Sequence, residues 1–241
     1  MIKRAIYSIL LILITSLKVM GLPYCDVRKF SIIDGLAANT ISDIAQTPDR
    51  LMWFSTWNGI SYYDGNSFHT FRDDADDIDL LSTNRFMGIY ATARNNVWCI
   101  TASRRLYAYE TILCTFVPVG DNINKLYNID LRVDKIYPIK HDNTWVTTKS
   151  GDYLIRINGL QREGNIPELI KVGQDGLRSG NVWHIWADKK KRDWILTDKG
   201  TTIYHSQFST PIPFKWIREV GDNVFLATED GRLAVFDENN K

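Results

Sequence analysis

Two side chains stand where they could contact a ligand, and these are Trp57 and His184. An exposed indole at Trp57 could stack on the face of a sugar ring, and packing inside the fold is the alternative. His184 lies between two tryptophans, Trp183 and Trp186. We expect it to be a plain polar residue of a channel, because no cluster of histidine, cysteine and carboxylate residues has metal-ligand spacing. Trp57 and His184 are the two positions at which we predict contact with a ligand.

No group of residues in the sequence has the spacing of a catalytic or cation site. The acidic run Asp73–Asp79 offers oxygen ligands for calcium, but it lacks the glycine and the distal glutamate of a known calcium loop. We interpret this run as a solvated linker. A hydrolase or lyase would need carboxylates, or a histidine and a carboxylate, brought together from distant segments. We predict no catalytic residue, no metal and no cofactor.

The elements that position these residues are repeats. The pattern Trp-x-x-Thr-x-x-Gly recurs at intervals of 45, 47 and 49 residues, and then, with phenylalanine for tryptophan, at 31. Self-similarity at roughly 40–50 residues is the signature of a β-propeller, in which each repeat forms a four-stranded blade. Arg104 replaces the glycine of the second repeat. The repeat residues are Trp53, Thr56, Gly59, Trp98, Thr101, Trp145, Thr148, Gly151, Trp194, Thr197, Gly200, Phe225, Thr228 and Gly231.

Apolar pairs three residues apart precede these patterns. Such a spacing places both side chains on one face of a strand only if a β-bulge intervenes, because the period of a strand is two. We predict a bulged innermost strand in every blade, and this alignment makes Trp183 and Trp186 core residues rather than an aromatic platform. The pairs are Ile41 and Ile44, Phe86 and Ile89, Val133 and Ile136, Trp183 and Trp186, and Ile217 and Val220.

The tryptophan segment is predicted to be the second strand of each blade, with its side chain between adjacent blades. The glycine that follows permits a positive φ in the next turn, so blade two must use a different turn at Arg104 or accept strain. Blade five is expected to stop after its third strand. A strand from Val27–Ile33 could close a five-bladed ring, or the chain could be part of an incomplete seven-bladed ring. The all-β blades are predicted near 35–71, 81–116, 126–172, 176–210 and 214–237.

Composition indicates an exported globular chain. The 241 residues are 44% hydrophobic and carry a net charge of +1, which allows a sizeable core and argues against a nucleic-acid surface. A basic start, the apolar run Ala5–Leu17 and a small residue at Gly21 predict a signal peptide over 1–21 and a propeller segment over 22–241. The apolar run is short for an uncleaved anchor, which would span ~20 residues. The three cysteines are expected to be free thiols, two of them buried.

The strings Asp34–Ile41 and Asp175–Asn181, each leading to Trp-x-x-Thr-x-x-Gly, resemble the two-component-regulator propeller repeat. Leu81–Asn84 is a partial third copy, and blades three and five lack this element. The repeat is found in the periplasmic sensor region of hybrid two-component systems of Bacteroidetes. The resemblance spans roughly residues 30–237.

This resemblance implies a periplasmic sensor segment that detects oligosaccharides released from polysaccharides and has no catalytic activity of its own. It also implies that the segment packs against the rest of a sensor ectodomain and dimerises in the full-length protein. The kinase and DNA-binding parts of that family have no counterpart in this sequence, so the segment itself is not expected to bind nucleic acid. The alternative is a free-standing exported propeller that acts as an interaction scaffold or as a carbohydrate-active hydrolase or lyase.

Overall fold

The structure is a computed structural model that describes residues 27–72, 83–92, 96–110, 114–139, 143–159, 166–174 and 176–237. The chain divides into two units, Met1–Phe30 and Ser31–Lys241. Every element below belongs to the second unit. The predicted signal peptide, the acidic run and Cys25 lie outside the described residues.

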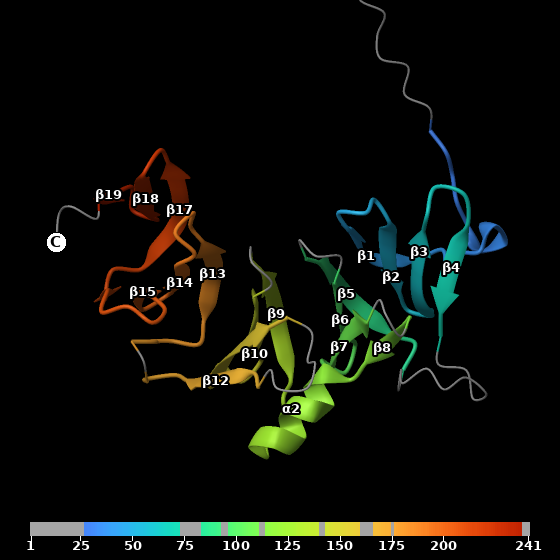
Figure 1. Ribbon diagram of the computed structural model, residues 1–241, viewed down its shortest axis with the longest axis horizontal. Helices are drawn as coiled ribbons and strands as arrows, with labels where there is room; N and C mark the ends of the chain where they lie inside the picture. The colour runs from blue at the N-terminus through green and yellow to red at the C-terminus, as the bar shows by residue number, and fades with distance from the viewer. Residues whose placement is uncertain are drawn as a thin grey trace, which may run out of the picture. The chain divides into compact units, whose positions relative to one another are not determined.

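Five antiparallel sheets follow one another along the chain, each with its strands in sequence order (Figure 1). Four have four strands and the last has three, so the predicted all-β propeller fold is confirmed, as is the end of blade five after its third strand.

Blade one is β1 (Ile41–Gln46), β2 (Met52–Thr56), β3 (Gly59–Tyr63) and β4 (Phe68–Phe71). Blade two is β5 (Phe86–Ala91), β6 (Val97–Thr101), β7 (Leu106–Glu110) and β8 (Thr115–Val117). Blade three is β9 (Val133–Pro138), β10 (Asn143–Thr148), β11 (Tyr153–Asn158) and β12 (Glu168–Lys171). Blade four is β13 (Val182–Ala187), β14 (Asp193–Thr197), β15 (Gly200–Ile203) and β16 (Ser209–Thr210), and blade five is β17 (Phe214–Val220), β18 (Asn223–Thr228) and β19 (Leu233–Phe236).

The predicted bulge is present in the first strand of all five blades, where the register against the second strand shifts by one residue. This bulge confirms the apolar pairs predicted for the first three blades and corrects the pairs predicted for blades four and five. Val182 and Ile185 take the core positions in blade four, and Phe214 and Ile217 take them in blade five. The assignment of Trp183 and Trp186 to the core pair was one residue out of register.

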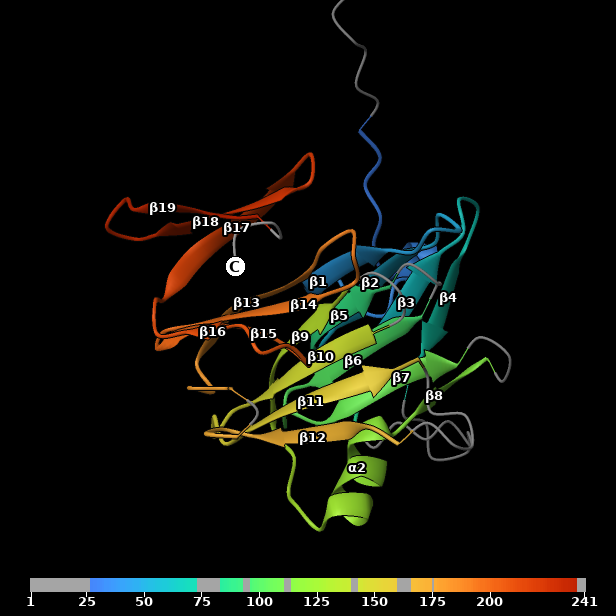
Figure 2. The ribbon, with the colours of Figure 1, turned by 60° about the vertical axis from the view of Figure 1, so that its left-hand side comes forward.

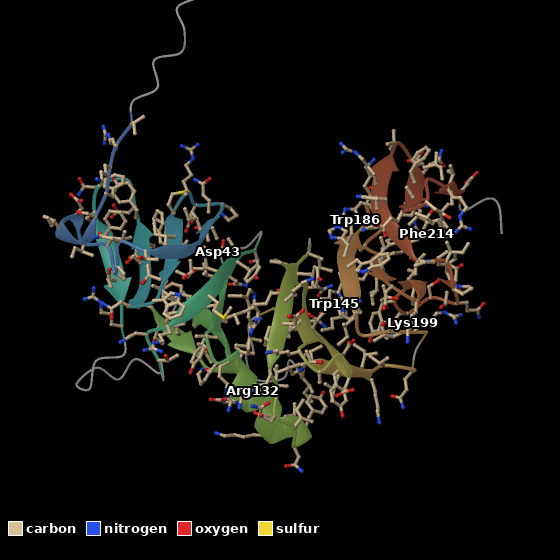
Figure 3. All side chains as sticks on the ribbon, turned by 180° about the vertical axis from the view of Figure 1, so that it is seen from behind. Asp43, Arg132, Trp145, Trp186, Lys199 and Phe214 are labelled. Atoms are coloured by element: carbon tan, nitrogen blue, oxygen red, sulfur yellow. The ribbon has the colours of Figure 1, made fainter. Side chains whose placement is uncertain are left out.

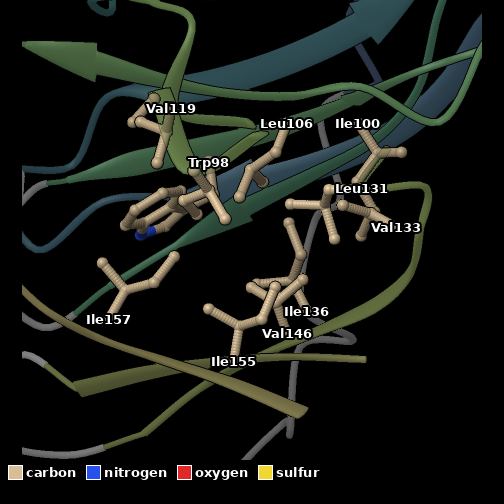
Figure 4. Close-up of a cluster of buried hydrophobic side chains, with 12 residues drawn as sticks. Trp98, Ile100, Leu106, Val119, Leu131, Val133, Ile136, Val146, Ile155 and Ile157 are labelled. Atoms are coloured by element: carbon tan, nitrogen blue, oxygen red, sulfur yellow. The ribbon is translucent and has the colours of Figure 1, made fainter. Parts of the chain in front are cut away.

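The tryptophans fill the spaces between successive blades, as predicted. Trp98 of blade two lies in one cluster with Val146, Ile155 and Ile157 of blade three (Figure 4). Trp53, Trp145 and Trp194 pack in the same way against the blade that follows each of them. All four indoles are at most 1% exposed. Truncation of such a side chain typically costs about 3–5 kcal/mol, so these rings are the main link between neighbouring blades.

The two end blades have one sheet face that no neighbouring blade in the described residues covers. Phe225, the fifth repeat aromatic, is only half-buried. Leu233 and Val235 of β19 are 67% and 51% exposed, and Ile44 on β1 is 51% exposed. A strand from Val27–Ile33 does not complete blade five, because Ile32–Asp34 forms a short 3-10 helix that Ser31 caps. The expectation of a strand there was therefore wrong.

The glycines after each second strand take the positive φ that the sequence predicts. Gly59, Gly151, Gly200 and Gly231 have φ of 118°, 73°, 150° and 88°. Arg104 keeps the turn of Gly151 and Gly231 at a φ of 66°, with its N–H bonded to the carbonyl of Thr101, so blade two accepts the strain. Its side chain then reaches Asp134 of blade three, where Nη1 lies 3.8 Å from Oδ1.

One helix, α2 (Val119–Tyr127), is not predicted by the repeats. It lies in the connection between β8 and β9 (Figure 2). Val119 and Ile123, one turn apart, are buried in the same cluster as Trp98. Of the two described cysteines, Cys99 is buried and Cys114 is exposed, and burial raises the pKa of the Cys99 thiol.

Candidate functional site

One end of the blades brings together the residues that could bind a ligand. In every blade the first strand begins where the second strand ends, as in the pairs of Ile41 with Thr56 and Val182 with Thr197. The turn after the second strand therefore lies beside the connection that enters the first strand. Backbone hydrogen bonds link these turns to the next blade, for example from Gly59 N to Asn84 O at 2.7 Å. We call this end the connector face.

Trp57 lies on the connector face, in the turn between β2 and β3, and it is 58% exposed. The Cζ atom of Arg85 is 5.8 Å from the centroid of its ring, within the range of a cation–π contact. The ring is accessible, as stacking on a sugar would require. Its predicted role in ligand binding stays a prediction.

His184 lies on β13 and is exposed. Removal of water from the surroundings of its ring lowers its pKa, which favours the neutral imidazole. No contact described in the structure joins it to Trp57, which belongs to a different blade. Trp186 is half-buried against the cluster that contains Trp194 and Phe214 (Figure 3).

An aromatic platform, which we define as Trp183, Lys215 and Trp216, lies where blades four and five meet. Trp183 and Lys215 are the extra residues of the bulges in β13 and β17. The Lys215 ammonium lies 5.6 Å from the ring centroids of both tryptophans. Trp183 is half-buried, and Trp216 is 54% exposed. Lys215 Nζ also lies 2.6 Å from Oε1 of Glu229, in the turn after β18.

This arrangement combines apolar ring faces with a cation and a carboxylate at one exposed place. Aromatic rings stack on the C–H faces of sugars and other flat apolar groups, and the charged groups can exchange hydrogen bonds with hydroxyls. Glu229 takes in blade five the position that Trp57 takes in blade one. The connector face thus carries different chemistry in each blade while the backbone stays the same.

The sequence reasoning missed Lys215 and Trp216 and misread Trp183, because the distance from the apolar pair to the repeat aromatic was not held constant. In the first three blades the first core residue precedes the repeat threonine by 15 residues, and the same distance in blade four identifies Val182. In blade five the distance is 14, and the structure identifies Phe214. The residue after each is then the bulge residue, Trp183 or Lys215.

Two pockets also open on the connector face. The first, of about 550 Å³, lies in blade three between the residues that follow α2 and the turn after β10, and Arg132 and Lys149 are among its lining residues. Arg132 is held by Asp130, with 3.0 Å between Nε and Oδ2. The second, of about 510 Å³, lies in blade four and is lined by Gly173, Gly176, Leu177, Arg178 and Lys199 (Figure 3).

Within the described ranges, no three histidine, cysteine or acidic side chains are grouped so that they could hold a metal ion. In the same ranges, no helix is both long enough and apolar enough to cross a lipid bilayer.

Two solved bacterial proteins share this architecture. The extracellular domain of BT4673 from B. thetaiotaomicron superposes with a TM-score of 0.54 at 16% identity, over 88% of this chain and 33% of that chain. The chain shares its fold with that domain. BT4673 is named a one-component system in this structure and a hybrid two-component system in another, which has a TM-score of 0.52 at 15% identity over 88% of this chain and 33% of that one.

A further structure, PorZ of Porphyromonas gingivalis, gives a TM-score of 0.52 at 12% identity, over 86% of this chain and 28% of that chain. PorZ is a surface component of the type-IX secretion system. The chain spans about a third of the length of the first matching ectodomains. No family model matches the sequence, and no curated protein does. The similarity in fold to the BT4673 ectodomain confirms the fold resemblance that the repeats predict.

Proposed function

We propose that this chain is the ligand-binding propeller segment of an exported sensor and that it recognises a saccharide at the aromatic platform. The observation that carries the proposal is the pair of tryptophans formed by the half-buried Trp183 and the exposed Trp216, with the Lys215 ammonium 5.6 Å from both ring centroids. The similarity in fold to the BT4673 ectodomain supports the sensor part of the proposal.

The platform suits a saccharide better than a purely apolar ligand. A sugar ring has an apolar face of C–H groups and an edge of hydroxyls, so it needs both a ring to stack on and polar groups beside it. Trp183 and Trp216 supply the rings, and the Lys215–Glu229 pair supplies a donor and an acceptor at the edge. We propose binding without turnover, in a periplasmic segment that has no cofactor.

The uncovered face of blade one supports the proposal that this segment works as part of a larger ectodomain. Ile44 on this face is apolar and 51% exposed. Burial of such surface contributes roughly 25 cal/mol per Å², so a further blade packed on this face would be stabilising. Dimerisation of the full-length protein is part of the same proposal.

Binding of the purified chain to a panel of plant and host oligosaccharides, measured by calorimetry, tests the proposal. We expect Trp216→Ala to weaken binding by about tenfold, the size of a lost stacking contact. Trp57→Ala tests the other predicted position, because Trp57 is an exposed tryptophan beside a cation on the same face.

Trp57→Ala should leave the affinity within about twofold, which is below 0.5 kcal/mol. If Trp57→Ala abolishes binding and Trp216→Ala does not, the site lies in blade one and the platform proposal is wrong. Turnover of any oligosaccharide in the panel would overturn the non-catalytic part.

A further inference from the structure

The pocket of blade four is lined by two cations, Arg178 and Lys199. We infer that this basic pocket binds the carboxylate or sulfate group of an acidic saccharide. The inference rests on the proposed function, because the rest of the saccharide would lie on the aromatic platform.

Blade one shows what the same place looks like without such a pocket. The two blades share one register: the carbonyl of Gly35 accepts a hydrogen bond from the hydroxyl of Thr70 on β4 at 2.8 Å, and the carbonyl of Gly176 accepts one from the hydroxyl of Ser209 on β16 at 3.3 Å. The next residues, Leu36 and Leu177, are buried to the same degree, at 3% and 2% exposed. The residues that follow can therefore be compared one by one.

In blade one, the side chain of Arg72 closes this place. It donates from Nη2 to the carbonyl of Ala37 at 2.9 Å and from Nε to the carbonyl of Asn58 at 3.1 Å. Arg72 follows β4 directly, and Pro211 follows β16 directly in blade four. Proline has no side-chain donor that could make these bonds. The place stays open in blade four, with a volume of about 510 Å³.

The same comparison shows that blade four has gained one positive charge. Arg178 stands where blade one has Ala37, and Lys199 stands where it has Asn58. The Arg178 side chain lies over the turn, with its Cδ 2.8 Å from the place where a Cβ on Gly200 would be, as Arg72 does in blade one, where its Cγ is 2.9 Å from such a Cβ on Gly59. Arg178 thus replaces Arg72 as the cation over the turn, and Lys199 is the added one.

No carboxylate in the described part of the chain pairs with Arg178 or Lys199. Asp175, in the same loop, lies outside the described residues. Other arginines of this face are paired, such as Arg104 with Asp134 and Arg132 with Asp130. Two like charges in one pocket repel each other, and a bound anion removes that repulsion. A guanidinium fits a carboxylate or sulfate through two parallel hydrogen bonds, while an ammonium adds a point charge.

The basic pocket and the platform lie on either side of the start of β13. Asp198, next to Lys199, donates its backbone N–H to the carbonyl of Asn181 at 3.3 Å. Trp183 is two residues further along the chain. One oligosaccharide can therefore stack on the platform and place an acidic group in the pocket. The ligand class is an oligosaccharide with a carboxylate or a sulfate.

The test compares oligogalacturonides with their carboxyl-reduced products, which keep the sugar, the linkage and the length but lose the charge. The variant carries Arg178→Ala and Lys199→Asn, which place the blade one residues in blade four and should leave the fold unchanged by circular dichroism. Calorimetry should show the wild-type chain binding the acidic form at least tenfold more tightly, and the double variant losing that preference. Binding of the carboxyl-reduced form should be the same in both.

Titration with inorganic sulfate, followed by the amide NMR signals of Gly176 and Lys199, tests the pocket without a saccharide. Shifts that occur in the wild type and vanish in the double variant would support the pocket, even if no saccharide binds and the proposed function fails. Equal affinity for the acidic and the reduced form in the wild type would overturn the inference and leave the platform standing. Absence of any sulfate-dependent shift would overturn it as well.

Discussion

The indole Nε1 of Trp145 donates a hydrogen bond of 3.0 Å to Oδ2 of Asp193. Asp193 immediately precedes the tryptophan of the next blade, so this bond joins blades three and four inside their shared core. Arg156 Nε lies 3.3 Å from the same oxygen. The indoles of Trp53 and Trp98 have no such acceptor in the described residues.

Asp193→Leu should lower the free energy of unfolding by about 2–4 kcal/mol, because it leaves a buried indole N–H without an acceptor and removes one carboxylate from Arg156. Urea unfolding measures this. Thr144→Val is the control, because Thr144 has the position of Asp193 relative to Trp98 and makes no bond to that indole. A loss below 1 kcal/mol in Asp193→Leu would show that the bond does not stabilise the blade interface.

Two buried aspartates of blade four should respond to pH in opposite directions. Burial raises the pKa of Asp193. Burial acts in the same sense on Asp188, but hydrogen bonds from the Arg192 backbone, the Trp194 indole and the Arg192 guanidinium outweigh it and lower its pKa. The folded state therefore holds the Asp193 proton more tightly than the unfolded state does, and holds the Asp188 proton less tightly.

As the pH rises above ~3.9, the unfolded value, the free energy of unfolding of the wild type should fall relative to Asp193→Asn until the folded pKa is passed. Above a pH of ~3.9 the ionised Asp188 should make the wild type more stable than Asp188→Asn. This difference in the free energy of unfolding should be lost as the pH falls through the lowered folded pKa of Asp188. Urea titrations at several pH values measure both differences. Parallel curves for the two variants would contradict the assignment.

Gly180→Ala should destabilise the contact between blades three and four. A Cβ at Gly180 would lie 1.8 Å from the carbonyl oxygen of Gly151, so backbone would have to move. Overpacking of this kind typically costs about 1–3 kcal/mol. Thermal unfolding measures it. A loss below about 1 kcal/mol would mean that the close approach is relaxed in solution.

Arg104→Gly should stabilise the chain. Arg104 has a φ of 66° in a turn where four other blades have glycine. A left-handed conformation costs a residue with a side chain about 1–2 kcal/mol. The partly exposed pair with Asp134 contributes at most about 1 kcal/mol, so its loss offsets only part of the gain. We expect an increase of about 0.5 kcal/mol in urea unfolding, whereas a decrease would show that the Arg104–Asp134 contact outweighs the strain.

Val235→Lys should reduce self-association of the purified chain. Val235 is 51% exposed on β19, the outermost strand of a three-stranded sheet. Exposed apolar edge strands pair with other chains, and a lysine on such a strand opposes this pairing. Sedimentation velocity measures the change. The substitution should leave the ion pair of Lys215 with Glu229 unaffected. An unchanged sedimentation profile would show that this edge does not drive association.

The periodicity of the sequence alone determined the architecture. One tryptophan per repeat, with threonine and glycine at constant spacing, defines the second strand and the turn after it, and it places the indole between blades. The bulge could be predicted as well, because two apolar residues three apart fit one face of a strand only with an inserted residue. These features are local or strictly repeated, so each copy supports the others.

Only the tertiary structure decided which side chains share a site. Trp183 and Lys215 are 32 residues apart in the sequence and occupy the bulges of two different blades. Arg178 and Lys199 meet because the turn of blade four folds back beside the connection that enters it. Such contacts depend on the register of one blade against the next, and a shift of one residue turns a side chain from the core to the surface. Blade five is the example, because its first core residue lies 14 rather than 15 residues before the repeat threonine, and only the structure places Lys215 in its bulge.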